Sequence, residues 1–297
     1  MITENKNDLF KHLIKRAETV LEALPYLIKF NGKTIVIKYG GAAMQNEELK
    51  QSVIQDVVLL KMVGMEPILV HGGGPEINKY LRKKGLEPKF IGGYRVTDKE
   101  TMKVVQKVLG EKINQQIVTL IKKAGGRAKG FYGKKGRVIK AYRYLKKDAE
   151  GNKIDLGFTG QVGGVRYRFL KKWMKLGYIP VLTSIGVGKR GEVYNINADK
   201  AAAAIAAYLK AEKMIMLTDV RGVMDISGKL ISELNTYRAG KMIKGGSISG
   251  GMIPKVKSCL YALKKGVKTA HIIDGRVPHA ILLELFTDYG IGTMVRK

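Results

Sequence analysis

The sequence has one cysteine and no long apolar run, and each shortage excludes a class of protein. Cys259 permits no internal disulfide, which fits a reducing cytosol, and its apolar helical context indicates a core residue rather than a nucleophile. No apolar run approaches the ~18 residues that cross a bilayer, and the first residues lack the uninterrupted apolar core of a signal peptide. We therefore expect a cytoplasmic protein with no membrane partner.

Acidic residues are also scarce. The chain has 25 Asp and Glu against 54 Lys and Arg, a formal net charge of +29, and residues 122–147 contain eleven Lys and Arg with no acidic residue. Such a field attracts anions, nucleic acid included. Because no known nucleic-acid module is present and the aromatic residues form no stacking pattern, we favour a lysine-rich surface around a site for anionic substrates, with no nucleic-acid partner.

Helical and strand patterns alternate along the chain. Its 297 residues, 45% of them hydrophobic, suffice for one large α/β domain or two lobes that share a sheet. Residues 7–28 are predicted to form an amphipathic helix that Pro25 ends or kinks, packed on its own core or on another subunit. Further helices are predicted at 47–63, from about 76, and at 99–123, 166–176, 200–210 and 255–265. Strands are predicted at 34–38, 67–70, 178–184, 192–195, 214–217 and, as the last, 270–273, with hairpins in 126–163.

The chain is organised around the strand that ends in Lys38 and is followed by Gly40 and Gly41. A glycine pair lets the backbone approach a ligand and turn its N–H groups towards it, and ligands of open α/β sheets bind at the carboxyl ends of strands. This combination suits a phosphate; the alternative is a glycine turn with a solvated lysine. The next strand leads to Gly73 and Gly74 at a helix start, which makes a second anion cradle.

Later loops carry further charged and amide groups. Arg95 lies just before a helix cap, Thr97 or Asp98, where a guanidinium could pair with a carboxylate; the alternative is a surface arginine. Asn195 and Asp199 lie near another helix start, where Asn and Asp usually act as caps; that alternative is strong for Asn197 and weaker for Asn195 and Asp199 together.

Two loops suit a nucleotide or its phosphates. The loop with Asp219 and Gly222 follows a strand, and Met252 and Lys255 follow a glycine pair at a helix start. His71 is the obvious candidate general base, but at a strand end before glycines we expect a hydrogen-bonded structural histidine.

Two common nucleotide signatures do not apply. The segment 186–191 matches GxGxxG, but the residues that follow it indicate a short strand, whereas the dinucleotide fingerprint must open a helix. The P-loop pattern GxxxxGK[ST] does not occur. Phosphoryl transfer without a P-loop remains the reading that the glycine loops and the two lysines favour together.

As a set, these loops resemble the N-acetyl-L-glutamate kinases of the amino-acid-kinase family, from Thr34 to Val295. The resemblance implies an α/β fold: a three-layer αβα sandwich around a mainly parallel sheet, with an extra N-terminal helix. Its implied parts are an oligomerisation helix at 1–29, an N-lobe at 30–190 for acetylglutamate and dimerisation, and a C-lobe at 191–297 for ATP and regulation. The matching motifs are 37–41, 71–75, 95–98, 155–157, 194–199, 217–219 and 250–255.

The implied reaction is ATP-dependent phosphorylation of the γ-carboxylate of N-acetyl-L-glutamate, the second step of arginine biosynthesis. Lys38 and Lys255 would stabilise the moving phosphoryl group, with Asp199 orienting them. The implied acetylglutamate-binding set is Gly73, Gly74, Arg95 (on the α-carboxylate) and Asn195. The implied ATP-binding set is Gly40, Gly41, Asp219, Gly222 and Met252. Mg²⁺ would be held mainly by the ATP phosphates, so no protein metal ligand is named. An acceptor carboxylate is already ionised at pH 7, which fits the lack of a convincing general base.

The N-terminal helix and the C-terminal motifs resemble those of arginine-inhibited members. The resemblance implies a homo-hexamer, built as a trimer of dimers, and feedback inhibition by L-arginine bound near Tyr26, His271, Glu284 and Gly292. Whether a regulatory signalling protein docks on that hexamer stays open.

This chain departs from the family pattern at three places. The charged residues of 133–136 are both lysines where an acidic residue is usual, Tyr94 follows two glycines in place of Asn-Gly-Leu, and Arg221 replaces a proline. The alternatives are a kinase of the same fold acting on aspartate, glutamate, carbamate or carrier-bound aminoadipate, or a basic module that binds nucleic acid or protein.

Overall fold

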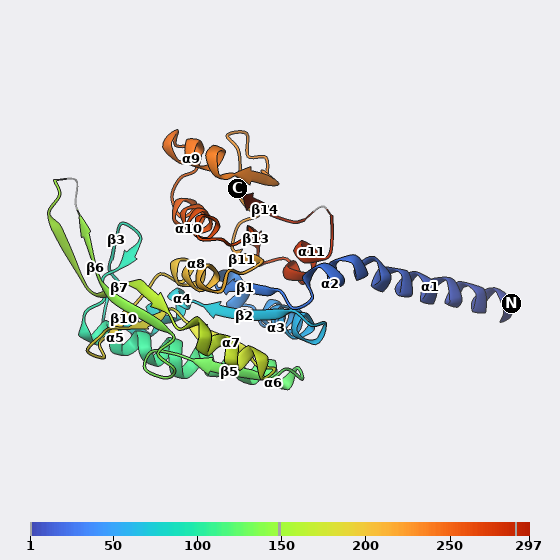
Figure 1. The fold of residues 1–297 in the computed structure, drawn as a ribbon, viewed down its shortest axis with the longest axis horizontal. Coiled ribbons are helices and arrows are strands. Elements are labelled where there is room, and N and C mark those ends of the chain that lie inside the picture. The colour runs from blue at the N-terminus through green and yellow to red at the C-terminus, as the bar shows by residue number, and fades with distance from the viewer. Residues whose placement is uncertain (1, 148–149, 289) are drawn as a thin grey trace.

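An eight-stranded sheet forms the centre of the computed structural model, which describes residues 2–147, 150–288 and 290–297 (Figure 1). The strand order is β12-β14-β13-β11-β1-β2-β8-β5, and every neighbouring pair is parallel except β13 and β14. The strands are β1 (Thr34–Tyr39), β2 (Glu66–His71), β5 (Ala128–Phe131), β8 (Ile179–Thr183), β11 (Lys213–Thr218), β12 (Glu233–Asn235), β13 (Thr269–Asp274) and β14 (Thr293–Arg296).

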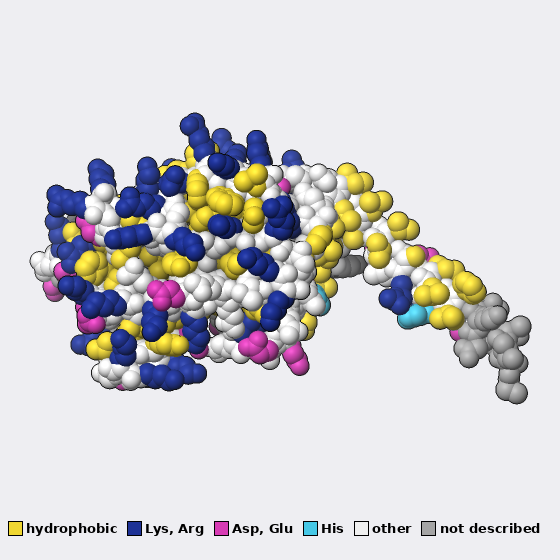
Figure 2. All heavy atoms as spheres, turned by 90° about the horizontal axis from the view of Figure 1, so that it is seen from below, with side chains coloured by type: hydrophobic (Ala, Val, Ile, Leu, Met, Phe, Trp, Pro, Cys, Tyr) yellow, Lys and Arg dark blue, Asp and Glu magenta, His cyan; other side chains and the backbone are white. Residues whose placement is uncertain are grey.

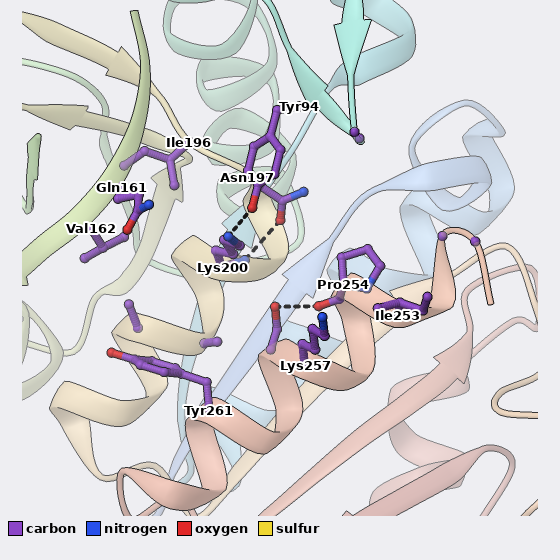
Figure 3. A pocket seen from close by; sticks show the side chains of 17 residues that line it. Tyr94, Gln161, Val162, Ile196, Asn197, Lys200, Ile253, Pro254, Lys257 and Tyr261 are labelled. Carbon is purple, nitrogen blue, oxygen red and sulfur yellow. Dashed lines mark hydrogen bonds between the residues drawn. The ribbon is translucent and has the colours of Figure 1, made fainter. Parts of the chain in front are cut away.

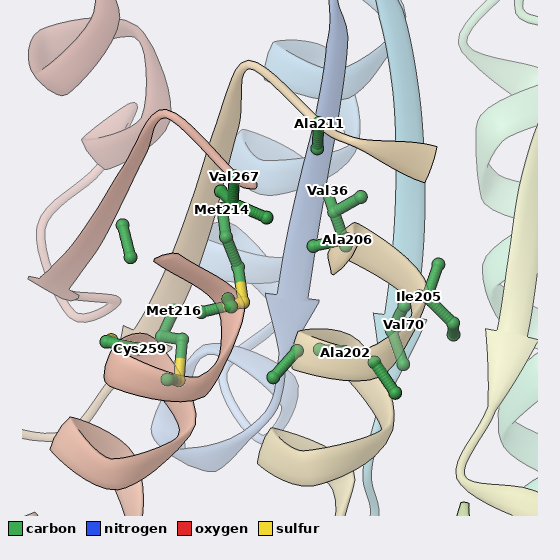
Figure 4. Packing of buried hydrophobic residues seen from close by; sticks show 14 of the residues in the cluster. Val36, Val70, Ala202, Ile205, Ala206, Ala211, Met214, Met216, Cys259 and Val267 are labelled. Carbon is green, nitrogen blue, oxygen red and sulfur yellow. The ribbon is translucent and has the colours of Figure 1, made fainter. Parts of the chain in front are cut away.

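Helices cover both faces of this sheet, so the expected three-layer αβα sandwich is confirmed. Neighbouring strand residues point to opposite faces, and β1 therefore contributes Val36 to one core and Ile35 and Ile37 to the other. One core packs under α7 (Tyr167–Lys175), α8 (Ala198–Leu209), α9 (Thr236–Lys244) and α10 (Met252–Lys264). The other packs under α3 (Glu47–Met62), α4 (Gly74–Lys83), α5 (Lys99–Gln106), the π-helical η2 (Lys107–Asn114), α6 (Gln115–Lys123) and α11 (Ala280–Leu285). Cys259 is buried in the first core, as predicted (Figure 4).

Smaller strands build a separate layer at one end of the sheet. The strands β6 (Ile139–Lys147), β7 (Lys153–Val165), β9 (Ile185–Val187) and β10 (Val193–Asn195) are hydrogen-bonded in a ring. The GxGxxG segment joins β9 to β10 as a turn, so the exclusion of a dinucleotide fingerprint is confirmed. The hairpin of β3 (Phe90–Ile91) and β4 (Tyr94–Arg95) completes the set.

The N-terminal segment projects from the body of the protein (Figure 1). The helix α1 (Ile2–Glu22) ends just before α2 (Leu24–Phe30), whose first turn contains Pro25, so the predicted break is confirmed. From Leu9 onward the apolar side chains of α1 are exposed, for example Phe10 at 61% and Val20 at 69%, which contradicts the alternative of a helix folded back on its own core (Figure 2). Among the described residues, we find no helix with the length and apolar character that a membrane crossing needs.

Two of the sequence predictions need correction. The predicted single helix 99–123 contains the π-helical η2, whose last residue Asn114 donates hydrogen bonds to the carbonyl of Val181 at 3.0 Å and to His71 Nε2 at 3.1 Å. The strand near 270–273 is not the last one, because residues 293–296 return as β14 beside β13. The elements β3, β4, β12, α9 and α11 and the short 3₁₀ helix η1 (Gly41–Met44) were not predicted.

Candidate functional site

One carboxylate lies between two lysines that are far apart in the sequence. Lys38 comes from β1, Asp199 from the first turn of α8, and Lys255 from the first turn of α10. The Nζ atom of Lys38 is 3.2 Å from Asp199 Oδ1, and that of Lys255 is 3.1 Å from Oδ2. The three residues share the carboxyl-end side of the sheet because β1 is parallel to its neighbours and both helices begin there.

The local sequence sets the position and charge of Asp199. The side chain of Asn197 caps α8 by accepting hydrogen bonds from the N–H groups of Asp199 and Lys200, at 3.0 and 3.1 Å. Burial alone would raise the pKa of the Asp199 carboxyl, but Lys38 and Lys255 outweigh it and the pKa lies below its usual range. The group is therefore an ionised carboxylate that holds two ammonium groups.

A cavity of about 240 Å³ opens beside this carboxylate. Its walls include the predicted residues Lys38, Gly40, Gly41, Gly73, Gly74, Arg95, Asn195 and Asp199. The backbone forms part of the wall directly: a Cβ atom on Gly73 would lie 2.5 Å from Ile113 Cδ1 and 2.7 Å from Leu109 Cδ2. A larger residue at this position would have to displace both side chains, so glycine keeps the loop compact where it lines the cavity.

Arg95 is buried in the wall and incompletely paired. Its Nη2 donates to Asn78 Oδ1 at 2.6 Å, its guanidinium lies 4.6 Å from the Phe90 ring centre, and Nη1 has no hydrogen-bond partner in the described part of the chain. Burial lowers the pKa of Arg95 to about 10, so the group is still charged at pH 7. A buried cation with an unused donor suits an anionic partner.

Asn195 is held near Arg95 by threonines that the sequence reading did not assign to the site. Asn195 Nδ2 donates to Thr97 Oγ1 at 3.2 Å, and Thr159 Oγ1 donates to the carbonyl of Arg95 at 2.5 Å. Thr97 is not the helix cap, because Asp98 Oδ1 accepts the N–H of Thr101 at 2.7 Å. These contacts join segments far apart in the chain, so no local pattern marks them.

His71 is buried and hydrogen-bonded, as predicted for a structural histidine. Its Nδ1 lies 2.9 Å from the carbonyl of Gly72, to which an Nδ1–H donates, and its Nε2 accepts from Asn114. Burial lowers the pKa of His71 to about 4, so the ring is neutral at pH 7.

Of the predicted nucleotide residues, Gly40 and Gly41 line the 240 Å³ cavity, whereas Asp219, Gly222 and Met252 are not among the described residues that line it. Asp219 approaches Gly41 so closely that a Cβ atom there would lie 2.2 Å from its Oδ1, and Gly41 has a φ of +73°. Gly222 packs against Thr293, and Met252 opens α10. Gly41 thus connects the lysine-bearing loop to the Asp219 loop.

A separate cavity of about 330 Å³ is lined by all four residues of the predicted arginine set, Tyr26, His271, Glu284 and Gly292. His271 Nδ1 lies 2.6 Å from Glu284 Oε1, and Lys213 Nζ lies 3.0 Å from His271 Nε2. Burial lowers the pKa of His271, which matches a neutral ring that donates to Glu284 and accepts from Lys213. Tyr26 lines the cavity from α2, and its hydroxyl donates a hydrogen bond to Asp288.

Comparison with known proteins gives consistent matches. The model of the amino acid kinase family matches residues 33–274. An acetylglutamate kinase of Syntrophus aciditrophicus is 51% identical over 284 residues, with 94% of this chain and 96% of that protein covered, and one of Aquifex aeolicus is 50% identical over 293 residues, with 95% and 98% covered.

Solved structures also resemble this chain in fold. A protein from Streptococcus mutans, smu.665, has a TM-score of 0.73 at 30% identity, over 89% of this chain and 98% of that one. An N-acetylglutamate synthase from Neisseria gonorrhoeae, complexed with coenzyme A and N-acetyl-glutamate, has a TM-score of 0.85 at 24% identity, over 95% of this chain and 63% of that one.

Proposed function

The chain belongs to the amino acid kinase family, and from this and its 50% identity to acetylglutamate kinases we propose that it phosphorylates the γ-carboxylate of N-acetyl-L-glutamate with ATP. The product is the acyl phosphate N-acetyl-L-glutamyl 5-phosphate, formed in the second step of arginine biosynthesis. The observation that carries the proposal is the carboxylate of Asp199 between the ammonium groups of Lys38 and Lys255. The single reduced thiol also favours a cytoplasmic location.

The chemical problem is to bring two anions together. The acceptor carboxylate is ionised at pH 7, so it can attack the γ-phosphorus of ATP without a general base. The barrier then lies in charge repulsion and in the charge spread over the transferred phosphoryl group. Lys38 and Lys255 would supply fixed positive charge on that group, and Asp199 would hold both ammonium groups in place before the substrates bind.

The acceptor would lie in the 240 Å³ cavity. We propose that Arg95 pairs with its α-carboxylate through the unused Nη1 donor, and that Gly73, Gly74 and Asn195 contact the rest of the molecule. This arrangement would direct the γ-carboxylate towards Lys38, which lines the same cavity.

The donor would lie on the C-terminal side. Gly40 and Gly41 would give N–H groups to the phosphates, and Asp219, Gly222 and Met252 would line the nucleotide pocket. The cations and glycine loops fit a polyphosphate, and Mg²⁺ bound to the phosphates would neutralise part of their charge. We propose a division into residues 1–29, 30–190 and 191–297; the border between the lobes then falls between β11 and β1 in the central sheet.

Trapping with hydroxylamine tests the activity. The purified protein, MgATP and N-acetyl-L-glutamate should give the hydroxamate, whereas glutamate, aspartate or carbamate in place of the acceptor should not. A stronger signal with one of those acceptors would assign the chain to a related kinase. Salt-sensitive nucleic-acid binding without any acyl phosphate would indicate a binding module.

We also propose that L-arginine binds in the 330 Å³ cavity and inhibits the enzyme. Carboxylates of Glu233, Glu284 and Asp288 line this cavity and could bind its cationic groups, and Lys29 and Lys213 could bind its carboxylate. Because Tyr26 comes from α2, the cavity is linked to the N-terminal helices.

The exposed apolar face of α1 supports a role in assembly, and we propose that it packs on another copy in a hexameric trimer of dimers (Figure 2). Deletion of residues 1–25 should reduce the mass measured by light scattering and weaken the inhibition by arginine. Unchanged mass and unchanged inhibition would contradict both parts of this proposal.

A further inference from the structure

The hairpin β3–β4 carries Arg95 and has little support of its own. Two residue pairs form it, Phe90 with Arg95 and Ile91 with Tyr94, and its turn consists of Gly92 and Gly93, both with positive φ. A two-stranded hairpin of this length is not stable in isolation. Its base is fixed by Thr159, which donates to the carbonyl of Arg95, so the position of its tip depends on contacts made by the other side chains.

Tyr94 makes those contacts with two other elements, and Figure 3 shows the one with Lys200. Its hydroxyl accepts a hydrogen bond from the ammonium of Lys200 in α8, and its ring centre lies 4.6 Å from that of Tyr144 in β6. The same ammonium lies 5.5 Å from the Tyr144 ring centre, within the range of a cation–π contact. The structure shows no carboxylate paired with Lys200 among the described residues, so the two tyrosines are its main partners.

This cluster lies between two cavities. Tyr94 lines the 240 Å³ cavity and also a larger one of about 800 Å³ between α8 and α10, which Lys200 and Lys257 line as well. We call the contacts of Lys200 and Tyr144 with Tyr94 the clamp. Successive strand residues point to opposite faces, so the clamp holds Tyr94 on one face of the hairpin and leaves Arg95 directed to the other. Lys200 also follows Asp199 directly, so one helix turn carries both the carboxylate between the catalytic lysines and the anchor of the hairpin.

We infer that Lys200 and Tyr144 are positioning residues that hold Tyr94 and thereby fix the hairpin β3–β4 with Arg95 directed at the acceptor. This inference rests on the proposed function, because it assigns Arg95 to the acceptor. Loss of the clamp should weaken acceptor binding and leave the nucleotide side nearly unchanged, since the clamp contacts none of the proposed ATP residues.

The test compares Lys200→Met and Tyr94→Phe with a matched control, Lys257→Met. Lys257 is an exposed lysine of the same large cavity, so its loss removes the same charge without touching the hairpin. We expect Lys200→Met to raise the KM for N-acetylglutamate about tenfold or more, as for a lost hydrogen bond to a charged group, with the KM for ATP within about twofold of the wild type. Tyr94→Phe keeps the ring and all charges and should shift the same parameter. The double variant should be little worse than the larger single effect, because one bond is lost in each case.

A readout independent of activity is tryptic cleavage after Lys89, an exposed residue at the base of the hairpin. The rate of this cleavage is measured by mass spectrometry. Lys200→Met should raise it, and Lys257→Met should leave it unchanged. Equal KM shifts in the Lys200 and Lys257 variants would reduce the effect to charge and overturn the inference, as would an unchanged KM and cleavage rate in both clamp variants. If the wild type makes no acyl phosphate, the proposed function fails, while the cleavage result still decides whether the clamp holds the hairpin.

Discussion

Replacing Asp199 by asparagine tests whether its negative charge is what holds the ammonium groups of Lys38 and Lys255 in position. The amide keeps the size of the carboxylate but loses the charge that holds Lys38 at 3.2 Å and Lys255 at 3.1 Å. At an effective dielectric constant of ~20, each contact corresponds to about 5 kcal/mol of Coulomb attraction before desolvation is subtracted. Breaking such a buried set by removing one partner costs about 3–5 kcal/mol of stability.

The substitution should change kcat and the KM for ATP differently. Without the carboxylate, two ammonium groups repel each other and lose their fixed positions, so we expect kcat to fall by a factor of about 100–1,000. The site also becomes more positive by one charge, so the KM for ATP should stay level or fall. A loss of kcat without a rise in the KM for ATP is the expected signature.

The assay is the hydroxamate rate at varied ATP and acceptor, with urea unfolding of the same variant to show that it is folded. Asp225, a partly exposed carboxylate outside the site, offers a matched control, Asp225→Asn, which should retain wild-type kcat. A folded Asp199→Asn protein with kcat within threefold of the wild type would refute the reasoning.

Three further predictions follow from the same structure. Lys255→Ala should lower kcat by about 100-fold or more, while Lys257→Ala, an exposed neighbour on α10, should change it little, as hydroxamate rates will show. Arg95→Lys should raise the KM for N-acetylglutamate far more than that for ATP, because one ammonium cannot reproduce a guanidinium that holds Asn78 with Nη2 and the acceptor with Nη1; equal shifts would contradict the assignment. Because the pKa of His71 is lowered to about 4 from 6.5, the free energy of unfolding is highest above pH 6.5 and falls by about 3 kcal/mol as the pH falls towards 4. Urea unfolding at pH 7 and 4.5 should show this loss in the wild type and a smaller loss in His71→Asn.

The sequence predicted most strands and helices because their signals are local. The run 34–38 corresponds to β1, and the break at Pro25 follows from proline's missing N–H. The predicted helix starts at 76, 200 and 255 are two or three residues later than the observed starts at 74, 198 and 252, because glycine, proline or polar residues near each start interrupt the apolar pattern. The π-helical η2 was not predicted, because the apolar pattern of 99–123 does not distinguish a π-helical turn from an α-helical one.

The residue types at the strand ends, by themselves, determined the class of chemistry: lysines and glycine loops with no P-loop indicate anions and phosphate. Only the tertiary structure decided that Lys38, Asp199 and Lys255 meet, that Arg95 keeps an unused donor, and that Lys200 reaches across to Tyr94. The physical reason is distance along the chain. Local preferences act over a few residues, whereas these contacts depend on which strands pair and on which side of the sheet each helix begins.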